Sequence, residues 1–414
     1  MPESWRRPPI PSLPGSGSAP WLFDSASESL VCSAPDDVVA RLYVCGITPY
    51  DATHIGHANT YLAFDTLQRV WLDAGLEVHY AQNITDVDDP LLERANATGV
   101  EWRSLADQQI QLFRDDMAAL RILPPQDYVA VTEVIDRIAD AVSSLRARGI
   151  AYPVDTPDST GDDLYFDIAA AEQSSPWRLG EESNLSRDQM LALSAERGGD
   201  PDRPGKRDPL DPLLWRAARE GEPSWDSVVG RGRPGWHIEC SVIALDHLGH
   251  DFTVQGGGAD LAFPHHDLSA GHAAALSGHP LAKVYSHAGL LSYQGEKMSK
   301  SLGNLVLISD LLADGVPAAG IRLALLSHHY REEWEWTDAL LDDALQRLER
   351  WRDIRSDQNG LAATSVVSAV RARLADDLDT PGALCAIDDA ATTGVNDPEL
   401  IRATVDALLG IDLG

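Results

Sequence analysis

The chain has 414 residues with 44% hydrophobic content, which indicates a globular protein of roughly two or three domains. It has no apolar run of the ~18 residues that a membrane span needs, no signal-peptide pattern near its start and only four cysteines, so we expect a reduced, cytoplasmic protein without membrane contact. The 33 basic and 64 acidic side chains give a net charge of −31, which disfavours nucleic acid as a partner and favours a small substrate.

The first third of the chain predicts strands and helices in alternation. An irregular arm over residues 1–38 precedes a buried strand over 38–44 and a helix over 56–76, where apolar residues recur at helical spacing. A second strand over 78–84 and a helix over 105–121 continue the pattern. Such a strand–loop–helix unit directs a helix N-terminus at the ligand above the sheet, and that end favours phosphate.

The pattern changes after residue 121. Residues 122–225 predict an insertion with a helix over 131–148, two short strands over 150–154 and 163–168, and a polar stretch over 172–212. Strands return at 251–255 and 281–291, and from residue 310 the chain predicts helices, the clearest over 340–355 and 365–378.

The order of these elements predicts an α/β fold with a Rossmann-like, doubly wound parallel sheet. We expect four parts: an N-terminal arm, a catalytic core in two segments, an inserted connective domain and a C-terminal helical bundle. The arm comprises residues 1–38, and the catalytic core comprises 39–121 and 226–309. The inserted domain comprises 122–225, and the helical bundle comprises 310–414.

Two short motifs lie far apart in the chain, and a strand-like run precedes each of them. They are His54-Ile55-Gly56-His57 and Lys297-Met298-Ser299-Lys300-Ser301. Lys297 and Lys300 are two of only four lysines, and a lysine is a mobile point charge that suits a departing pyrophosphate. In this order the motifs resemble the ATP-handling signatures of class I aminoacyl-tRNA synthetases. The resemblance implies that a carboxylate attacks the α-phosphate of ATP and forms an acyl-adenylate.

Cysteine and histidine residues stand where an α/β sheet is expected to place its ligand site. Cys45 ends the first strand, Cys240 closes the segment Gly235–Cys240, and His265 and His266 follow in the next loop. Two thiolates and one imidazole, from Cys45, Cys240 and His265, would leave one position of zinc open, as in functional rather than structural zinc sites. The alternative is a pair of buried, inert cysteines and a solvated histidine pair.

Longer segments resemble the cysteinyl-tRNA synthetases over about residues 40–305. These segments are Tyr43–Gly46, Tyr50-Asp51, His54–His57, Lys206–Asp211, Gly235–Cys240, Gly256–Asp260 and Phe263–His266. That family implies activation of cysteine, with zinc holding the substrate thiolate. Zinc binds thiolate well and hydroxyl poorly, so an open zinc position separates cysteine from serine.

The chain departs from the cysteinyl-tRNA synthetases in four places. Ser269 replaces a zinc-side carboxylate, Ile47–Tyr50 replaces Pro-Thr-Val-Tyr, no anticodon-reading domain follows Leu408-Leu409-Gly410, and Glu196–Pro201 has no counterpart. These departures resemble the paralogous cysteine ligases of mycothiol biosynthesis, which join cysteine to the amine of glucosaminyl-inositol. We therefore expect an AMP-forming ligase that makes a carbon–nitrogen amide bond.

The resemblance also implies which residues handle the substrates. His54 and His57 would stabilise charge at the α-phosphate, and Lys297 and Lys300 would stabilise pyrophosphate leaving from ATP with magnesium. One zinc ion would bind Cys45, Cys240 and His265. The implied adenylate pocket consists of Cys45, Gly46, Ile47, Thr48, Thr60, Asn83, Ile84, Thr85, Trp236, Gly258, Ala259, Asp260 and Leu291.

Several expectations stay open at this point. Asp260 is the candidate base or ammonium-orienting group for amide formation, and Glu196–Pro201 would either receive the sugar or form a surface turn. A truncated cysteinyl-tRNA synthetase that charges tRNA is the first alternative. A zinc-dependent binding or regulatory protein is the second. We expect a monomer whose partners are cysteine, ATP and glucosaminyl-inositol.

Overall fold

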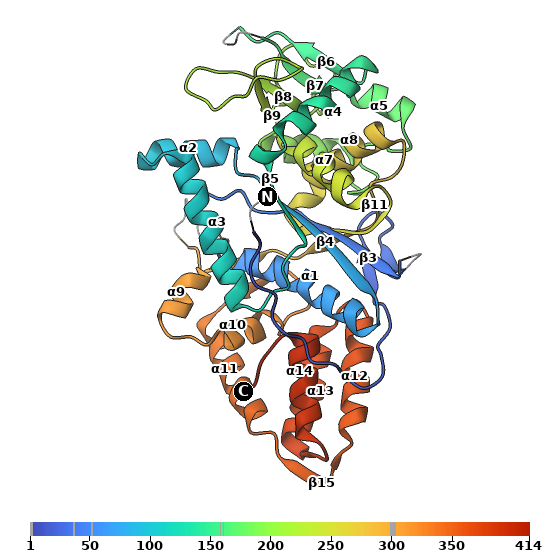
Figure 1. Ribbon diagram of the computed structural model, residues 1–414, viewed down its shortest axis with the longest axis vertical. Coiled ribbons are helices and arrows are strands. Elements are labelled where there is room, and N and C mark those ends of the chain that lie inside the picture. The colour runs from blue at the N-terminus through green and yellow to red at the C-terminus, as the bar shows by residue number, and fades with distance from the viewer. Residues whose placement is uncertain (1–2, 36–37, 51–52, 158, 160, 299–303) are drawn as a thin grey trace.

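The computed structural model describes residues 3–35, 38–50, 53–157, 159, 161–298 and 304–414. Asp51, Ser299, Lys300 and Ser301 of the sequence motifs lie outside these residues, as does the side chain of Lys297. Figure 1 shows an elongated molecule in which the central sheet lies between a β-rich part at one end and a bundle of helices at the other. Among the helices of the described residues, none has the length and apolar character to cross a membrane.

A five-stranded parallel sheet forms the centre of the molecule, with the strand order β11-β10-β3-β4-β5. Its strands are β3 (Val39–Val44), β4 (Glu77–Ile84), β5 (Asp127–Ala130), β10 (Phe252–Gly258) and β11 (Ala282–Ala288). The chain order runs outward from β3 in both directions, so the topological switch point lies between β3 and β10. In sheets of this kind ligands bind beyond the carboxyl ends of the strands at that point.

Helices cover both faces of the sheet, which confirms the predicted doubly wound α/β fold (Figure 1). α1 (Ile55–Asp73) packs on one face, and α7 (Trp236–Leu248) packs on the other with α8 (Asp267–Ser277) and α4 (Ile135–Ala147) against it. Successive side chains of a strand point to opposite faces. Accordingly Leu42 and Val44 are buried on the side of α1, whereas Tyr43 and Cys45 are buried on the side of α7.

The inserted part of the chain is built on a four-stranded antiparallel sheet (Figure 1). Its elements are β6 (Ala151–Val154), β7 (Asp163–Phe166), β8 (Leu213–Ala217), β9 (Gly232–Pro234), α5 (Ile168–Ser174) and α6 (Arg187–Glu196). α6 lies in the polar stretch 172–212, for which the sequence predicted no helix, and residues 131–133 form a 3-10 turn before α4. β5 lies within the range 122–225 yet pairs with β4 of the central sheet, and the domain boundaries stay a prediction.

Two helices and the N-terminal segment border the sheet. The helices are α2 (Asp89–Thr98) and α3 (Trp102–Ala119), and the segment contains β1 (Trp21–Asp24) and β2 (Ser29–Cys32). β1 and β2 pair as an antiparallel hairpin, so the region 1–38 is not irregular throughout. The backbone N–H of Ser25 donates to the carbonyl of Tyr285 at 2.8 Å, which anchors this hairpin beside β11.

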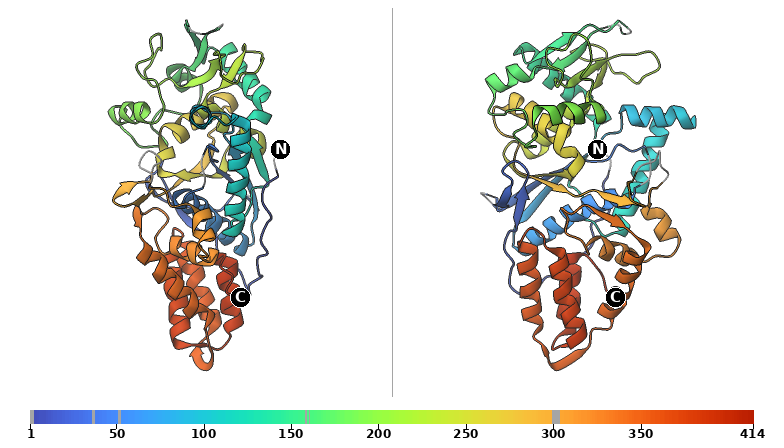
Figure 2. Two further views of the ribbon diagram at one scale, coloured as in Figure 1. Left: turned by 90° about the vertical axis from the view of Figure 1, so that its left-hand side faces the viewer. Right: turned by 180° about the vertical axis from the view of Figure 1, so that it is seen from behind.

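The C-terminal part is mainly helical, as predicted, and lies at the opposite end of the molecule from the insertion (Figure 2). Its elements with those that lead into it are β12 (Leu291–Tyr293), β13 (Glu296–Lys297), α9 (Ile308–Ala313), α10 (Ala318–Leu325), β14 (Trp334–Trp336), α11 (Asp338–Arg352), β15 (Ser356–Leu361), α12 (Ala363–Ala375), α13 (Thr380–Thr393) and α14 (Pro398–Leu409). β14 returns to pair in parallel with β12, which the sequence did not predict.

A buried ion-pair cluster joins the central sheet layer to the C-terminal helices. Asp65 of α1 accepts from Arg69 at 2.8 Å and from Arg322 of α10. Arg322 also donates to the carbonyl of Leu409 at the end of α14, at 2.6 Å. Burial would raise the pKa of Asp65, but the two guanidinium groups outweigh burial and hold this pKa below its usual value. The carboxylate therefore stays charged and fixes α1, α10 and α14 together.

Candidate active site

Two thiols and one imidazole meet at the switch point of the sheet. Cys45 follows β3, Cys240 lies in α7, and His265 lies in the short turn Ala262–His266 before α8. Their exposed fractions are 5%, 3% and 1% respectively. Their ligand atoms all lie within 4.8 Å of one another, and His265 Nε2 is 3.2 Å from Cys240 Sγ. The structure thus brings together the three residues that were predicted to bind zinc.

This donor set fits a zinc ion. Zinc–sulfur and zinc–nitrogen bonds of about 2.3 and 2.1 Å in a tetrahedron separate neighbouring donors by roughly 3.5 Å, close to the separation seen here. Burial lowers the pKa of His265, so its imidazole is neutral, which is the form that binds a metal. Burial raises the pKa of Cys240. A bound divalent cation would oppose that rise and favour the thiolate.

Neighbouring side chains orient the imidazole of His265. Its Nδ1 atom lies 3.0 Å from Nδ1 of His237, and the ring of Trp236 packs at 4.4 Å between centroids. These contacts leave Nε2 of His265 directed at Cys240. Ser269 donates its hydroxyl to the carbonyl of His237 at 3.1 Å, so it supports the same turn of α7.

A chain of polar contacts leads away from Cys45 and was missing from the sequence-based site. His266 Nε2 lies 3.3 Å from Cys45 Sγ, and Gln255 Nε2 lies 3.4 Å from the same sulfur. His266 Nδ1 then contacts His287 Nε2 at 2.8 Å, and His287 Nδ1 contacts Ser25 Oγ at 2.7 Å. Burial lowers the pKa of His287 to about 4 despite the nearby Asp24 and Asp260. Gln255, His287 and Ser25 stand in no recognisable motif, so the sequence carried no signal for them.

The segment after Cys45 is held against the end of β4. The backbone N–H of Gly46 donates to Asn83 Oδ1 at 2.7 Å, and the N–H of Thr85 donates to the carbonyl of Ile47 at 3.1 Å. A Cβ atom at Gly46 would lie 1.7 Å from the carbonyl oxygen of Asn83, so only glycine allows this approach. The predicted residues from 45–48 and 83–85 therefore form one continuous wall.

The two histidines of the first motif begin α1. His54 Nδ1 accepts from the backbone N–H of Gly56 at 3.1 Å and caps the helix, and its ring stacks on His57 at 3.8 Å. Burial lowers the pKa of His57 to about 4, so this imidazole is neutral near pH 7. Its Nδ1 atom is buried without a hydrogen-bond partner among the described residues.

Met298 of the second motif lies close to Gly56 of the first motif. A Cβ atom at Gly56 would lie 3.7 Å from Cε of Met298, which is the neighbour of Lys297 in sequence. The N–H of Ile55 donates to the carbonyl of Val306 at 2.9 Å, and the N–H of Ile308 donates to the carbonyl of Thr53 at 3.1 Å. The chain that follows the lysine segment is therefore tied to the start of α1, and Met298 lies near it, although the roles of Lys297 and Lys300 stay predictions.

Further predicted pocket residues lie at the end of β10. A Cβ atom at Gly258 would lie 2.8 Å from Asp260 Oδ1 and 3.7 Å from Thr60 Oγ1, so these three residues are neighbours. Ala259 begins the 3-10 turn that carries Asp260, and Leu291 is buried at the start of β12. The structure places these residues around the switch point, and their contacts with a nucleotide stay a prediction.

Comparisons with known proteins agree with this architecture. Residues 33–346 match the family described as tRNA synthetases class I (C) catalytic domain. The Mycobacterium tuberculosis methionyl-tRNA synthetase in complex with methionyl-adenylate superposes with a TM-score of 0.58 at 15% identity, covering 86% of this chain and 82% of that one. At this identity the superposition supports the fold alone.

Two curated relatives match nearly the whole chain. A protein of Clavibacter michiganensis subsp. michiganensis is 61% identical over 421 residues, covering 100% of this chain and 99% of the relative. A protein of Clavibacter sepedonicus is 62% identical over 406 residues, covering 95% and 99%. Both are named L-cysteine:1D-myo-inositol 2-amino-2-deoxy-alpha-D-glucopyranoside ligase. The chain therefore belongs to the family of class I (C) tRNA synthetase catalytic domains, within the branch that these ligases form.

Proposed function

We propose that this chain ligates L-cysteine to the amine of glucosaminyl-inositol with ATP, through a cysteinyl-adenylate, and releases AMP and pyrophosphate. The observation that carries the proposal is the meeting of Cys45, Cys240 and His265 at the carboxyl end of β3, together with the histidine-capped start of α1, the next element of the chain. A thiol-recognising donor set and a phosphate-directed helix end then share one site. The names of relatives that are 61–62% identical to this chain agree with this reaction.

In the first step a carboxylate oxygen of cysteine attacks the α-phosphorus of ATP. A new bond forms between this oxygen and the α-phosphorus. The bond between the α-phosphorus and the oxygen that bridges to the β-phosphate breaks, and pyrophosphate leaves with magnesium. The imidazoles at the start of α1, of which that of His57 is neutral, donate hydrogen bonds to the α-phosphate, where negative charge develops. Lys297 and Lys300 are proposed to stabilise the leaving pyrophosphate.

Selection of cysteine rests on the buried donor set. Cys45, Cys240 and His265 would hold zinc, and zinc when bound supplies an open Lewis-acid position that prefers a thiolate over a hydroxyl. The surrounding burial excludes water, and the ring of Trp236 closes the pocket next to His265. Serine would therefore be a poor substrate, although it differs from cysteine by one atom.

In the second step the amine nitrogen attacks the acyl carbon of the adenylate. The amide bond forms, the acyl–phosphate bond breaks, AMP leaves, and the amine gives up a proton. Asp260 is the proposed acceptor of that proton, because its carboxylate lies beside Gly258 and Thr60 at the end of β10. Asp260→Asn is expected to retain adenylate formation and to slow amide formation by about 100-fold. An unchanged rate of amide formation would remove Asp260 from this role.

The proposal is tested by ATP–pyrophosphate exchange with the zinc-loaded protein. Cysteine is expected to support exchange, and serine at the same concentration is expected to support at least about 1,000-fold less. Product analysis by mass spectrometry should then find a cysteinyl amide of glucosaminyl-inositol. Exchange that is equally fast with serine, or absent with cysteine, would refute the proposed function. One zinc per chain and a monomeric state are further expectations that metal analysis and sedimentation would check.

A further inference from the structure

The segment 196–206 contains Glu196–Pro201, the sequence motif to which the proposed reaction assigns no role. Arg197 follows directly after α6 and points back at the turn that precedes α8. Its Nη1 atom donates to the carbonyl of Asp260 at 2.7 Å and to the carbonyl of Phe263 at 2.5 Å. One guanidinium nitrogen thus holds two carbonyls of the turn that leads from β10 to His265.

Two glycines explain why the chain turns at this point. Gly198 has a φ of +82°, which a residue with a side chain rarely adopts. A Cβ atom at Gly199 would lie 2.6 Å from the carbonyl oxygen of Ser194 and 2.2 Å from its hydroxyl oxygen. Glycine at both positions ends α6 abruptly, so Arg197 is fixed at the C-terminal end of α6 rather than continuing the helix.

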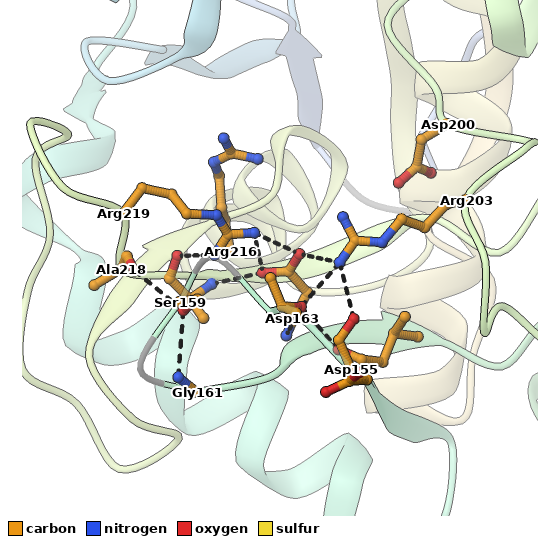
Figure 3. A network of polar contacts seen from close by, with 12 residues as sticks. Asp155, Ser159, Gly161, Asp163, Asp200, Arg203, Arg216, Ala218 and Arg219 are labelled. Carbon is orange, nitrogen blue, oxygen red and sulfur yellow. Dashed lines mark hydrogen bonds and ion pairs between the residues drawn. The ribbon is translucent and has the colours of Figure 1, made fainter.

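The far end of the segment is anchored in the sheet of the insertion. Arg203 donates to Asp163 of β7 at 3.0 Å and to the hydroxyl of Thr156 at 2.9 Å, and Arg219 binds the same carboxylate at 2.8 Å. Figure 3 shows Asp163 between these two arginines, with Asp200 on the side of Arg203. Lys206 binds Asp200 at 2.9 Å. The segment therefore joins the rigid sheet of the insertion to the turn of the candidate site.

The turn that Arg197 holds is not a regular α-helix. Residues 259–266 form two short non-α turns, and Phe263 between them has the extended angles φ −141° and ψ 138°. Asp260 and His265 project from this turn, so a shift of its backbone would displace both. Enzymes lose large factors in rate when a reacting group is misplaced by about 1 Å.

We propose that Arg197 is a positioning residue that fixes the 259–266 turn and thereby sets the places of Asp260 and His265. The effect on catalysis rests on the proposed function, whereas the effect on the turn does not. Arg197 and Asp200 already have partners within the protein. These contacts favour a structural turn over a contact with the sugar, the two alternatives that the sequence left open for this motif.

The first test measures amide hydrogen exchange in the metal-free protein. Arg197→Ala is compared with Arg187→Ala, a control on the same helix whose exposed side chain pairs with Asp208 at 2.6 Å. Loss of a charge-assisted hydrogen bond is expected to speed exchange in a peptide covering residues 259–266 by about 10-fold or more, with residues 163–166 unchanged. Equal exchange of residues 259–266 in both variants, or a uniform increase over the whole chain, would overturn the proposal.

The second test measures cysteine-dependent pyrophosphate exchange and the loss of zinc to a chelator. Arg197→Ala is expected to lower kcat/KM by about 10- to 100-fold and to release zinc faster, with Arg197→Lys in between because an ammonium still donates hydrogen bonds. If Arg197→Ala does not fold, Arg197→Lys is compared with Arg187→Ala in the same assays, and wild-type values in Arg197→Lys would overturn the proposal. An inactive wild-type protein would refute the proposed function, while the hydrogen-exchange result would still decide the role of Arg197.

Discussion

The two sides of the candidate site are built in different ways. On the cysteine side, Cys45, Cys240 and His265 come from three elements, are almost completely buried, and are oriented by neighbours such as His237. On the side proposed to bind the nucleotide, His54 and His57 lie at the start of α1 and are half-buried, and backbone hydrogen bonds join Val306 and Ile308 to this start. The difference supports the proposal that selectivity for the thiol is built into the packed core, whereas phosphate chemistry depends on the more exposed start of α1.

The largest effect is expected from a substitution that disrupts only the cluster of Cys45, Cys240 and His265. Cys240→Ser removes one of the two thiols, so we expect the loss of bound zinc and a fall of at least about 1,000-fold in cysteine-dependent pyrophosphate exchange. Metal analysis and exchange kinetics on the same preparation measure both effects. Cys385→Ser, which changes an exposed cysteine of α13, serves as the control and should behave like the wild type. Normal exchange by a zinc-free Cys240→Ser protein would contradict the role given to this cluster.

The second largest effect is expected from a substitution that changes only the histidines at the start of α1. His57→Ala is expected to lower kcat for pyrophosphate exchange by roughly 100-fold, the typical loss for one donor to a developing charge. The zinc content and the KM for cysteine should stay close to wild-type values, because His57 is not part of the thiol cluster. His250→Ala, at an exposed histidine between α7 and β10, is the matched control. A selective rise in the KM for cysteine would instead show that the two sides are not separable.

The third effect is expected from a substitution in the wall formed by residues 45–48 and 83–85. Gly46→Ala would force a Cβ atom against the carbonyl of Asn83, and we expect a loss of about 1–3 kcal/mol in the free energy of unfolding. Zinc retention and nucleotide turnover should fall together, in contrast to the two preceding variants. Gly75→Ala, where a side chain would meet no atom within 4 Å, controls for the substitution, although its φ of +86° adds local strain. Denaturant unfolding measures the difference, and equal stability of Gly46→Ala and wild type would contradict the close approach.

The smallest expected effect is a pH dependence from the nucleotide side. The pKa of His57 is lowered from its usual value to about 4 by burial, so the unfolded chain takes up this proton before the folded chain does. The contribution of His57 to stability is therefore complete above about pH 6.5 and is lost as the pH falls to about 4. The drop in Tm between about pH 7 and about pH 4.5 should be smaller in His57→Asn than in the wild type. An identical drop would show that His57 is not buried as a neutral ring.

Much of the fold could be predicted because its strands and helices carry strong apolar patterns. The strands expected over 38–44 and 78–84 and the helix expected over 56–76 correspond to β3, β4 and α1 within a few residues. The hairpin β1–β2 and strand β14 were missed because their strands have only three or four residues, and helix α6 because most of its residues are exposed. The formation of β14 also depends on pairing with a distant segment, β12. A local pattern carries no signal for such pairing.

The candidate site was predictable only where residue types reveal their chemistry. Cys45, Cys240 and His265 meet as expected, because thiols and imidazoles are residue types that indicate a metal site, although Cys240 lies in α7 and not in a loop. Polar neighbours of the cluster, Gln255 beside Cys45 and His287 beside His266, occur in unremarkable strand sequences. For the segment with Arg197 the sequence left open a contact with the sugar or a surface turn, and in the structure Arg197 bonds two backbone carbonyls. Every residue offers a carbonyl, so the sequence cannot indicate which one an arginine will reach.

The central claim is tested most directly by following AMP release with two acceptors in parallel. The zinc-loaded protein is supplied with cysteine and ATP, and either glucosaminyl-inositol or cysteine-specific tRNA is added. We predict rapid AMP release with the amino sugar, a cysteinyl amide as the product, and no cysteinylated tRNA. Charging of tRNA without any sugar amide would contradict the account and identify the chain as a cysteinyl-tRNA synthetase.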